Sequence, residues 1–292
     1  MIYTIENELL KIDVDSKGAQ LYSVYSKKSN TEYLWQGDPA YWTGRAYNLF
    51  PFIGRMYNGV YTYQGKEYAI RSHGVARYNE FAVEEQTATK LVFLLKDKEE
   101  TYKEYPFHFE YRVIFEIKNN TLSVCQEAKN TDEKILICGF GGHPGINVPF
   151  GKGSFEDYYL EFSKPTKVLQ QLLSENKFMA NKSEAYALEN GVKLPLKHSL
   201  FDNDAVILEN TSQCVSVKSD KESRVVKMYY EDFKYIGFWH ACETDAPYVC
   251  LEPWSALPAT EGKIDDLEQK KDMFHIDSGK TASAAFTLEI IE

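Results

Sequence analysis

The sequence predicts an all-β protein, one large antiparallel β-sandwich with few short helices. Apolar and polar residues alternate with a period of two, between turn residues, along most of the 292 residues. Aromatic residues, which favour strands, make up 14% of the chain. Strand and helix patterns do not alternate, which disfavours a parallel α/β sheet. Many strands and few helices in one chain therefore indicate a large antiparallel sandwich.

The alternation places the strands in order along the chain. Short runs at 60–63 and 66–70 flank Gln64-Gly65, and this pair of residues suits the two-residue turn of a hairpin. The last strand carries its apolar side chains on one face. The same pattern predicts strands at 111–117, 122–124, 215–217, 225–228 and 286–290.

Helical signal is confined to short stretches. Apolar residues at 168–173 have helical spacing, although the stretch is short and follows Pro165, and 265–274 suits one or two turns. Residues 174–198 are the most polar and least periodic part, so we expect a long excursion between strands, of the kind that often carries function. No repeat, low-complexity tract or linker divides the chain, so residues 1–292 are predicted to form a single domain.

Composition argues against several partners. The formal net charge is −10 and no cluster of Lys and Arg offsets it, so we expect no nucleic-acid partner. The N-terminus lacks a basic start and a continuous apolar run, and nothing later approaches the length of a membrane span, so no membrane association is expected. The five cysteines are an odd number without C-x-x-C spacing, which indicates reduced thiols in a cytoplasmic protein.

Four segments combine ionisable side chains with glycines and prolines: 48–55, 72–77, 141–147 and 250–254. His143 lies between Gly-Gly and Pro-Gly, so we expect an irregular turn to present its imidazole, which can transfer protons near neutral pH. The alternative is a histidine that bonds only to the local backbone. Glu252 has apolar neighbours, and such a carboxylate is either a buried structural partner or a functional group with a raised pKa.

Further candidates accompany these two residues. His73 precedes a glycine, and Arg77 and Arg55 offer planar donor forks suited to hydroxyls or a carboxylate, with ordinary surface pairing as the alternative. His240 is a candidate for the edge of a site, and Trp239 is either an apolar platform for a sugar or a core residue. No metal is expected, because no H-x-H, H-E-x-x-H or compact ligand pair appears. Glycine motifs for nucleotides and a G-x-S-x-G elbow are also missing.

Taken in order, these segments resemble the aldose 1-epimerase (galactose mutarotase) family, and in particular its LacX-like bacterial branch. The matching pieces are Phe-Pro-x-Ile-Gly-Arg ending at Arg55, the His-Gly pair at His73, His143-Pro144 and Leu-Glu-Pro-Trp around Glu252. The resemblance spans nearly the whole chain, and the order of the pieces is more specific than any one of them. It implies a galactose mutarotase-like supersandwich with its site in a cleft on one sheet and no cofactor.

The resemblance also implies roles for single residues. Glu252 corresponds to the family's general base and His143 to its general acid, while His73 and Arg55 correspond to residues that hold the sugar. Anomerisation removes a proton from the C1 hydroxyl while the ring oxygen gains one, and a carboxylate with a protonated imidazole suffices for this chemistry.

An aspartate that binds substrate precedes an apolar strand in the family. Asp204 directly precedes such a strand here, and Asp202 is the alternative. The acid His143 needs support from a neighbouring carboxylate, which we expect Asp204 to supply.

Three functions remain open. The preferred one is mutarotation of a free hexose or related aldose by an isomerase. The second is epimerisation of a hexose 6-phosphate, which needs a basic pocket facing C6, to which Arg77 and Arg71 could contribute. The third is a sugar-binding or regulatory protein without catalysis, which the presence of both proton-transfer residues disfavours. The sequence sets neither the sugar nor the oligomeric state.

Overall fold

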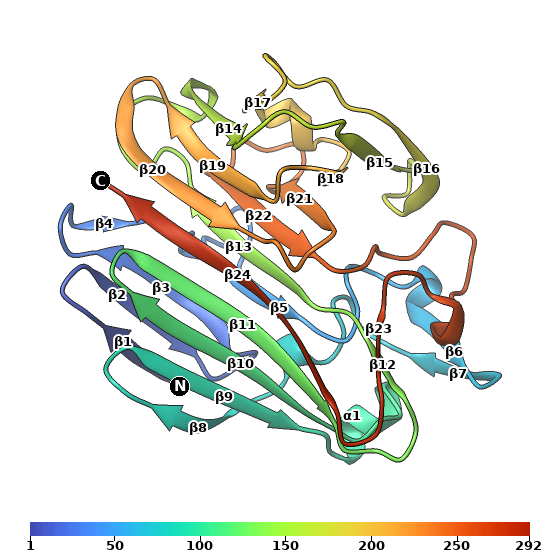
Figure 1. The fold of residues 1–292 in the computed structure, drawn as a ribbon. Coiled ribbons are helices and arrows are strands. Elements are labelled where there is room, and N and C mark those ends of the chain that lie inside the picture. The colour runs from blue at the N-terminus through green and yellow to red at the C-terminus, as the bar shows by residue number, and fades with distance from the viewer.

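The structure, a computed structural model, describes residues 1–292 and consists mainly of antiparallel strands (Figure 1). Strands hold 50% of the residues and helices 8%, so the predicted all-β class is confirmed. The one α-helix, α1, spans Glu99–Glu104. The remaining helical content consists of five short 3-10 turns: η1 (Tyr57–Gly59), η2 (Ala76–Tyr78), η3 (Phe155–Asp157), η4 (His198–Phe201) and η5 (Leu267–Gln269). No helix is long and apolar enough to cross a membrane.

Two large sheets form the main layers. The first has nine strands, in the order β17 (Lys193–Pro195), β14 (Tyr158–Phe162), β19 (Cys214–Ser219), β20 (Glu222–Tyr229), β24 (Thr281–Ile291), β11 (Thr121–Asn130), β10 (Phe109–Lys118), β9 (Lys90–Lys96) and β8 (Ala82–Gln86). The second has seven strands, in the order β16 (Met179–Ala185), β15 (Leu169–Leu173), β18 (Val206–Glu209), β21 (Tyr235–Trp239), β22 (Tyr248–Trp254), β13 (Gly141–Asn147) and β5 (Ala46–Leu49). In Figure 1, the red strand β24 runs between β20 and β11.

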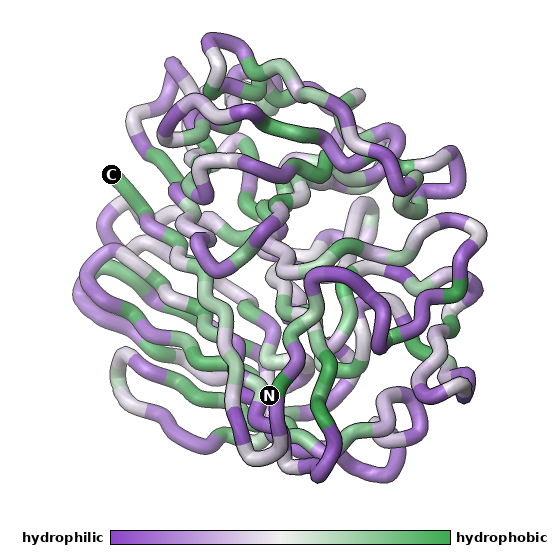
Figure 2. The backbone as a smooth tube through the Cα atoms, turned by 45° about the vertical axis from the view of Figure 1, so that its right-hand side comes forward, coloured by the Kyte–Doolittle hydropathy of each residue, from purple (hydrophilic) through white to green (hydrophobic).

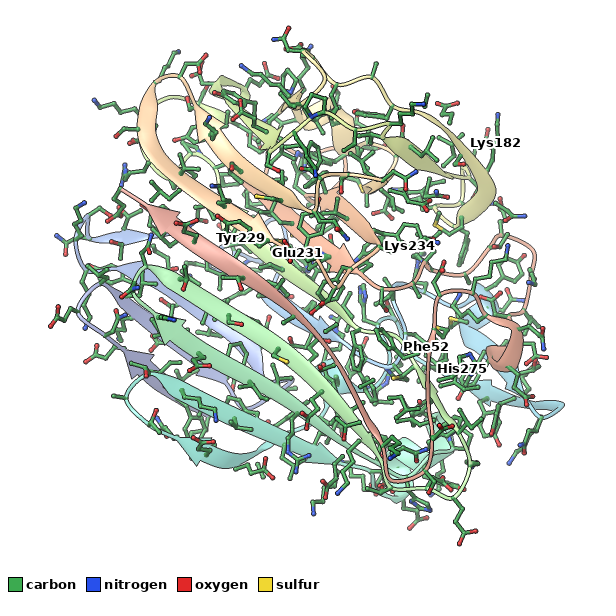
Figure 3. All side chains as sticks on the ribbon, in the orientation of Figure 1. Phe52, Lys182, Tyr229, Glu231, Lys234 and His275 are labelled. Carbon is green, nitrogen blue, oxygen red and sulfur yellow. The ribbon has the colours of Figure 1, made fainter.

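Three smaller sheets complete the fold. One contains β1 (Ile2–Glu6), β2 (Leu10–Asp15), β3 (Gln20–Ser26) and β4 (Thr31–Glu32). Two others pair β6 (Val60–Tyr63) with β7 (Lys66–Ala69), and β12 (Leu136–Cys138) with β23 (Phe274–Ile276). His275 on β23 is exposed and lies far from β16 (Figure 3).

One cluster of 66 buried hydrophobic residues, from Ile5 to Ile290, joins the sheets. Strand β22 shows how the layers divide, since Val249 and Leu251 belong to this core whereas Cys250 belongs to a separate small cluster. Because successive side chains of a strand point to opposite faces, Cys250 and Glu252 share the face that is turned away from the main core. Hydropathy alternates along the strands, and the peripheral turns are mostly hydrophilic (Figure 2).

Most of the strand predictions are confirmed. Gln64 and Gly65 turn between β6 and β7 with positive φ angles of 50° and 72°, as a tight hairpin turn requires. The runs at 111–124, 215–228 and 286–290 lie in β10 and β11, β19 and β20, and β24. A single short turn, η5, forms within 265–274.

Two predictions about the middle of the chain are wrong. Residues 168–173 are not helical, because Leu169–Leu173 forms β15, which pairs with β16 and β18. All five side chains of β15 are half-buried, so they lack the alternation that marks a strand. The excursion at 174–198 is also more regular than expected, since it contains β16 and β17.

Candidate active site

A pocket with a volume of about 330 Å³ opens on the face of the seven-stranded sheet that is turned away from the main core. Strands β5, β13, β15, β18, β21 and β22 form its floor, and the loops between them form its walls. Asp202, Arg71 and His240 are not among its lining residues. All seven residues proposed for the site from the sequence do line it: Glu252, His143, His73, Arg55, Asp204, Arg77 and Trp239.

His143 and Glu252 meet at the centre of the floor. Gly141 pairs with Trp254 and Gly145 with Cys250 in the antiparallel ladder of β13 and β22, so His143 lies opposite Glu252. Nε2 of His143 is 3.2 Å from Oε2 of Glu252. The backbone ladder of two central strands thus brings the imidazole and the carboxylate together.

The prediction that His143 lies in an irregular turn is wrong, because it is in the middle of β13. The glycines around it reflect crowding on both faces of the strand. A Cβ on Gly142 would lie 2.6 Å from Cε1 of Phe286, and one on Gly145 would lie 3.0 Å from Cβ of Trp35. Because glycine has no side chain, β13 can lie this close to its neighbours on both faces, and the glycines here do not interrupt the strand.

Burial sets the proton distribution in this pair. The side chains of His143 and Glu252 are 9% and 2% exposed. Burial lowers the pKa of His143 to about 3, and the nearby Arg77 adds to this decrease. Burial, followed by the charge of Asp204, raises the pKa of Glu252 well above its ordinary value. Between these two pKa values the pair holds one proton, and the 3.2 Å contact links the two positions that can carry it.

The carboxylate next to His143 is therefore Glu252, and the expectation that Asp204 supports His143 is wrong. Asp204 instead acts on Glu252, whose pKa it raises. Asp204 follows η4, has a φ of 74° and donates its amide N–H to the carbonyl of Phe201 at 3.0 Å. Burial raises the pKa of Asp204, while Lys177, Arg55 and the indole of Trp239 oppose the increase.

His73 enters the pocket wall from a tight turn with a φ of 65°. Its Nδ1 accepts a hydrogen bond from the amide of Gly54 at 3.2 Å, so the proton of the neutral ring is on Nε2. Burial lowers the pKa of His73 well below its ordinary value, and His143, Arg77 and Arg55 lower it further. His73 is thus a neutral donor beside His143, whose ring centroid is 5.6 Å away.

Aromatic rings support the two arginines. The guanidinium of Arg77 lies 3.7 Å from the centroid of Tyr47. That of Arg55 lies 4.8 Å from the centroid of Phe178, and its Nη2 donates to the carbonyl of Lys177 at 3.2 Å. Stacking holds each guanidinium plane and leaves N–H groups at its edge for a ligand.

Three lining residues with direct effects on the site were not identified from the sequence. Trp42 stacks on His143 with ring centroids 4.8 Å apart and planes at 29°, and its edge meets Trp239. Lys177 and Phe178 come from the turn between β15 and β16, at the start of the polar stretch 174–198. The aromatic run that contains Trp42 and the unusual length of the excursion were the available signals, and neither indicates which residue reaches the pocket.

His240 lies behind the pocket wall and not at its edge. It is fully buried, and its Nδ1 donates to the carbonyl of Ala241 at 2.7 Å. Its Nε2 consequently accepts a hydrogen bond from Nδ1 of His198 at 3.1 Å. This pair ties η4, which leads into Asp204, to the end of β21, which carries Trp239.

The donor set at the centre suits proton transfer better than metal binding. Ligand atoms of His143, Cys250 and Glu252 lie within 4.8 Å of one another, and all three residues are buried. Burial and the neighbouring Glu252 raise the pKa of the Cys250 thiol well above its ordinary value, so the thiolate that a metal needs is disfavoured. The facing atoms of the other two residues already contact each other.

Comparisons with known proteins agree with this architecture. The family model described as aldose 1-epimerase matches residues 1–263. Protein LacX of Lactococcus lactis subsp. lactis, in its chromosomal and its plasmid form, is 32% identical over 292 residues, which cover 96% of this chain and 97% of LacX.

Solved structures are similar over the full length. The galactose mutarotase related enzyme from Lactobacillus acidophilus has a TM-score of 0.94 and 36% identity, covering 100% of this chain and 98% of that one. A galactose mutarotase-like protein from Lactobacillus casei has a TM-score of 0.93 and 29% identity, covering 100% of both chains. The galactose mutarotase-like supersandwich predicted from the sequence is therefore confirmed.

Proposed function

Because the chain belongs to the aldose 1-epimerase family, we propose that it is a cofactor-independent isomerase that interconverts the α and β anomers of an aldose. The observation that carries the proposal is the buried contact of 3.2 Å between Nε2 of His143 and Oε2 of Glu252. It lies on the floor of a pocket of about 330 Å³, a volume within the usual range for small ligands.

In the proposed reaction, Glu252 accepts the proton of the C1 hydroxyl and His143 donates a proton to the ring oxygen. Both oxygens are bonded to C1, so two neighbouring groups can serve them from one side of the sugar. The C1–O5 bond breaks and leaves an open-chain aldehyde. Rotation about C1–C2 exposes the other face of the carbonyl, and closure returns both protons with the two groups in exchanged roles.

The single proton of the pair matches this cycle. In the free pocket burial keeps this proton on Glu252. When a sugar binds, the 3.2 Å contact lets the proton pass to His143, which makes Glu252 the base. A bound C1 hydroxyl then takes the place of the imidazole as the partner of the carboxylate. Neither group needs to exchange a proton with solvent during a turnover.

The surrounding residues are proposed to hold the sugar. His73 offers its Nε2–H to a sugar oxygen next to the reacting bond. Arg55 and Arg77 offer donor edges to hydroxyl groups, and Asp204 offers acceptor oxygens. Trp239 supplies an apolar face for the sugar ring.

Polarimetry tests the proposal. Freshly dissolved α-anomers of glucose, galactose, xylose and the hexose 6-phosphates are followed with the wild type, Glu252→Gln and His143→Asn. We expect the wild type to accelerate mutarotation of at least one sugar and both variants to lose the acceleration. A folded wild type that accelerates none of them would refute the enzyme and favour a sugar-binding protein.

A further inference from the structure

The pocket collects cations that have no carboxylate partner. Arg55, Arg77 and Lys177 all line it, and no carboxylate oxygen lies within 4.0 Å of their side-chain nitrogens. The guanidinium of Arg77 and the ammonium of Lys177 also donate no hydrogen bond within the protein. Arg112 and Arg224, by contrast, are paired with Glu84 at 2.6 Å and with Glu222 at 2.9 Å. The chain has 43 acidic against 33 basic residues, so unpaired cations in one cavity are unexpected from composition.

The three cations lie along one continuous wall. Arg77 and Arg55 both act on His73, whose pKa they lower. Arg55 and Lys177 both act on Asp204, and the bond from Nη2 of Arg55 to the carbonyl of Lys177 joins their two segments at 3.2 Å. The wall thus runs from the Arg77–Tyr47 stack past His73 to Asp204.

The carboxylates in the pocket do not neutralise this wall. Asp204 and Glu252 are the only carboxylates that line the pocket, and Glu252 already contacts His143 at 3.2 Å. Even with both carboxylates ionised, the lining keeps a positive formal charge, in a chain whose net charge is −10. A neutral aldose offers only hydroxyl groups to these cations, whereas guanidinium forks match the oxygens of a phosphate or carboxylate.

We propose that the substrate is an aldose with an anionic group, a phosphate or a carboxylate, on the carbon remote from the anomeric centre. Arg55 and Lys177, which lie together at the Asp204 end of the wall, bind this group, while the anomeric end lies at His143 and Glu252, near Arg77. The inference rests on the proposed epimerase activity and specifies its substrate class.

Paired sugars test this preference. Anomer exchange is measured by exchange NMR for glucose against glucose 6-phosphate, and for galactose against galacturonate. We expect kcat/KM to be at least about tenfold higher for the anionic member of one pair, which corresponds to about 1.4 kcal/mol. The pair with the larger ratio identifies phosphate or carboxylate as the recognised group. Higher ionic strength should reduce the ratio, because the wall is open to solvent.

Variants connect the preference to the wall. Lys177→Met should lower the anionic-to-neutral ratio of kcat/KM at least about threefold. Lys182→Met is the matched control, since it removes the same charge from the same hairpin but lies on the edge strand β16 with an exposed side chain outside the pocket (Figure 3). It should leave the ratio unchanged. If Lys177→Met does not fold, Arg55→Gln serves the same purpose, since Arg55 lies beside Lys177.

The outcomes separate this inference from the proposed function. If neutral sugars react as well as or better than their anionic partners, the anionic substrate is refuted while the epimerase stands. If the ratio survives the loss of Lys177, the proposed binding of the anionic group at this wall is refuted. If no sugar of either kind is converted by the folded protein, the epimerase itself is refuted.

Discussion

Replacement of Glu252 by Gln separates catalysis from folding at one position. Gln keeps the shape and volume of the side chain but cannot take the proton of the C1 hydroxyl. We expect kcat to fall by about 10²- to 10⁴-fold, the usual contribution of a positioned general base. This loss corresponds to about 2.7 to 5.4 kcal/mol of activation free energy.

The same change should increase stability at alkaline pH. Burial raises the pKa of Glu252, whereas the unfolded chain has an ordinary carboxyl pKa of about 4.3. A carboxyl with a raised folded pKa contributes stability that is complete below about pH 4.3 and is lost as the pH rises through the folded pKa. Gln does not ionise, so the variant avoids this loss. Its free energy of unfolding relative to the wild type should therefore be larger at pH 9 than at pH 5.

Two assays check these expectations. Polarimetry gives kcat, and urea denaturation at pH 5 and pH 9 gives the free energy of unfolding. Glu116→Gln is the control, since it removes an exposed carboxylate on β10, outside the pocket, and should change neither quantity. A fully active Glu252→Gln variant, or one whose relative stability decreases from pH 5 to pH 9, would refute the reasoning.

Two further substitutions and one measurement probe the pair and its surroundings. Gly142→Ala should destabilise the fold by about 1 to 3 kcal/mol, because its Cβ would lie 2.6 Å from Cε1 of Phe286, and an unchanged denaturation midpoint would contradict this. The ring of His143 should be neutral at pH 6 in the free protein, because burial lowers its pKa to about 3; nitrogen NMR that shows a protonated ring at this pH would be the opposite result. His198→Phe removes the hydrogen bond to His240 and should raise KM severalfold with less effect on kcat. If KM of the variant equals that of the wild type, the His198–His240 pair does not position the substrate-binding residues next to it.

Regular strands were predictable because each carries its own local signal. The β6–β7 hairpin follows from Gln64-Gly65, and β10 and β11 follow from clean alternation on either side of a turn. Strand β15 lacked such a signal because both of its faces are half-buried. Strand β13 was missed because its glycines are required by close contacts with residues that are distant in the sequence, such as Phe286.

The candidate site was predictable in its members but not in its contacts. The family resemblance selected five of the seven proposed residues, the chemistry of the side chains added Arg77 and Trp239, and the structure places all seven around one pocket. The contact between His143 and Glu252 depends on the pairing of β13 with β22, which a single sequence does not reveal. Trp42 and Lys177 come from loops without periodic patterns, so only the folded chain shows that they reach the pocket.

The ladder between β13 and β22 has a consequence for how this fold can diversify. A slip of one residue between the two strands would turn one of the reacting side chains to the opposite face, so their contact is as well protected as the sheet itself. The residues proposed to hold the substrate come largely from loops and short turns, including 55, 73, 77, 177 and 204. Exchange of those loops can therefore change which sugar is accepted without disturbing the proton transfer. Libraries for new substrates should vary the loops and leave both strands intact.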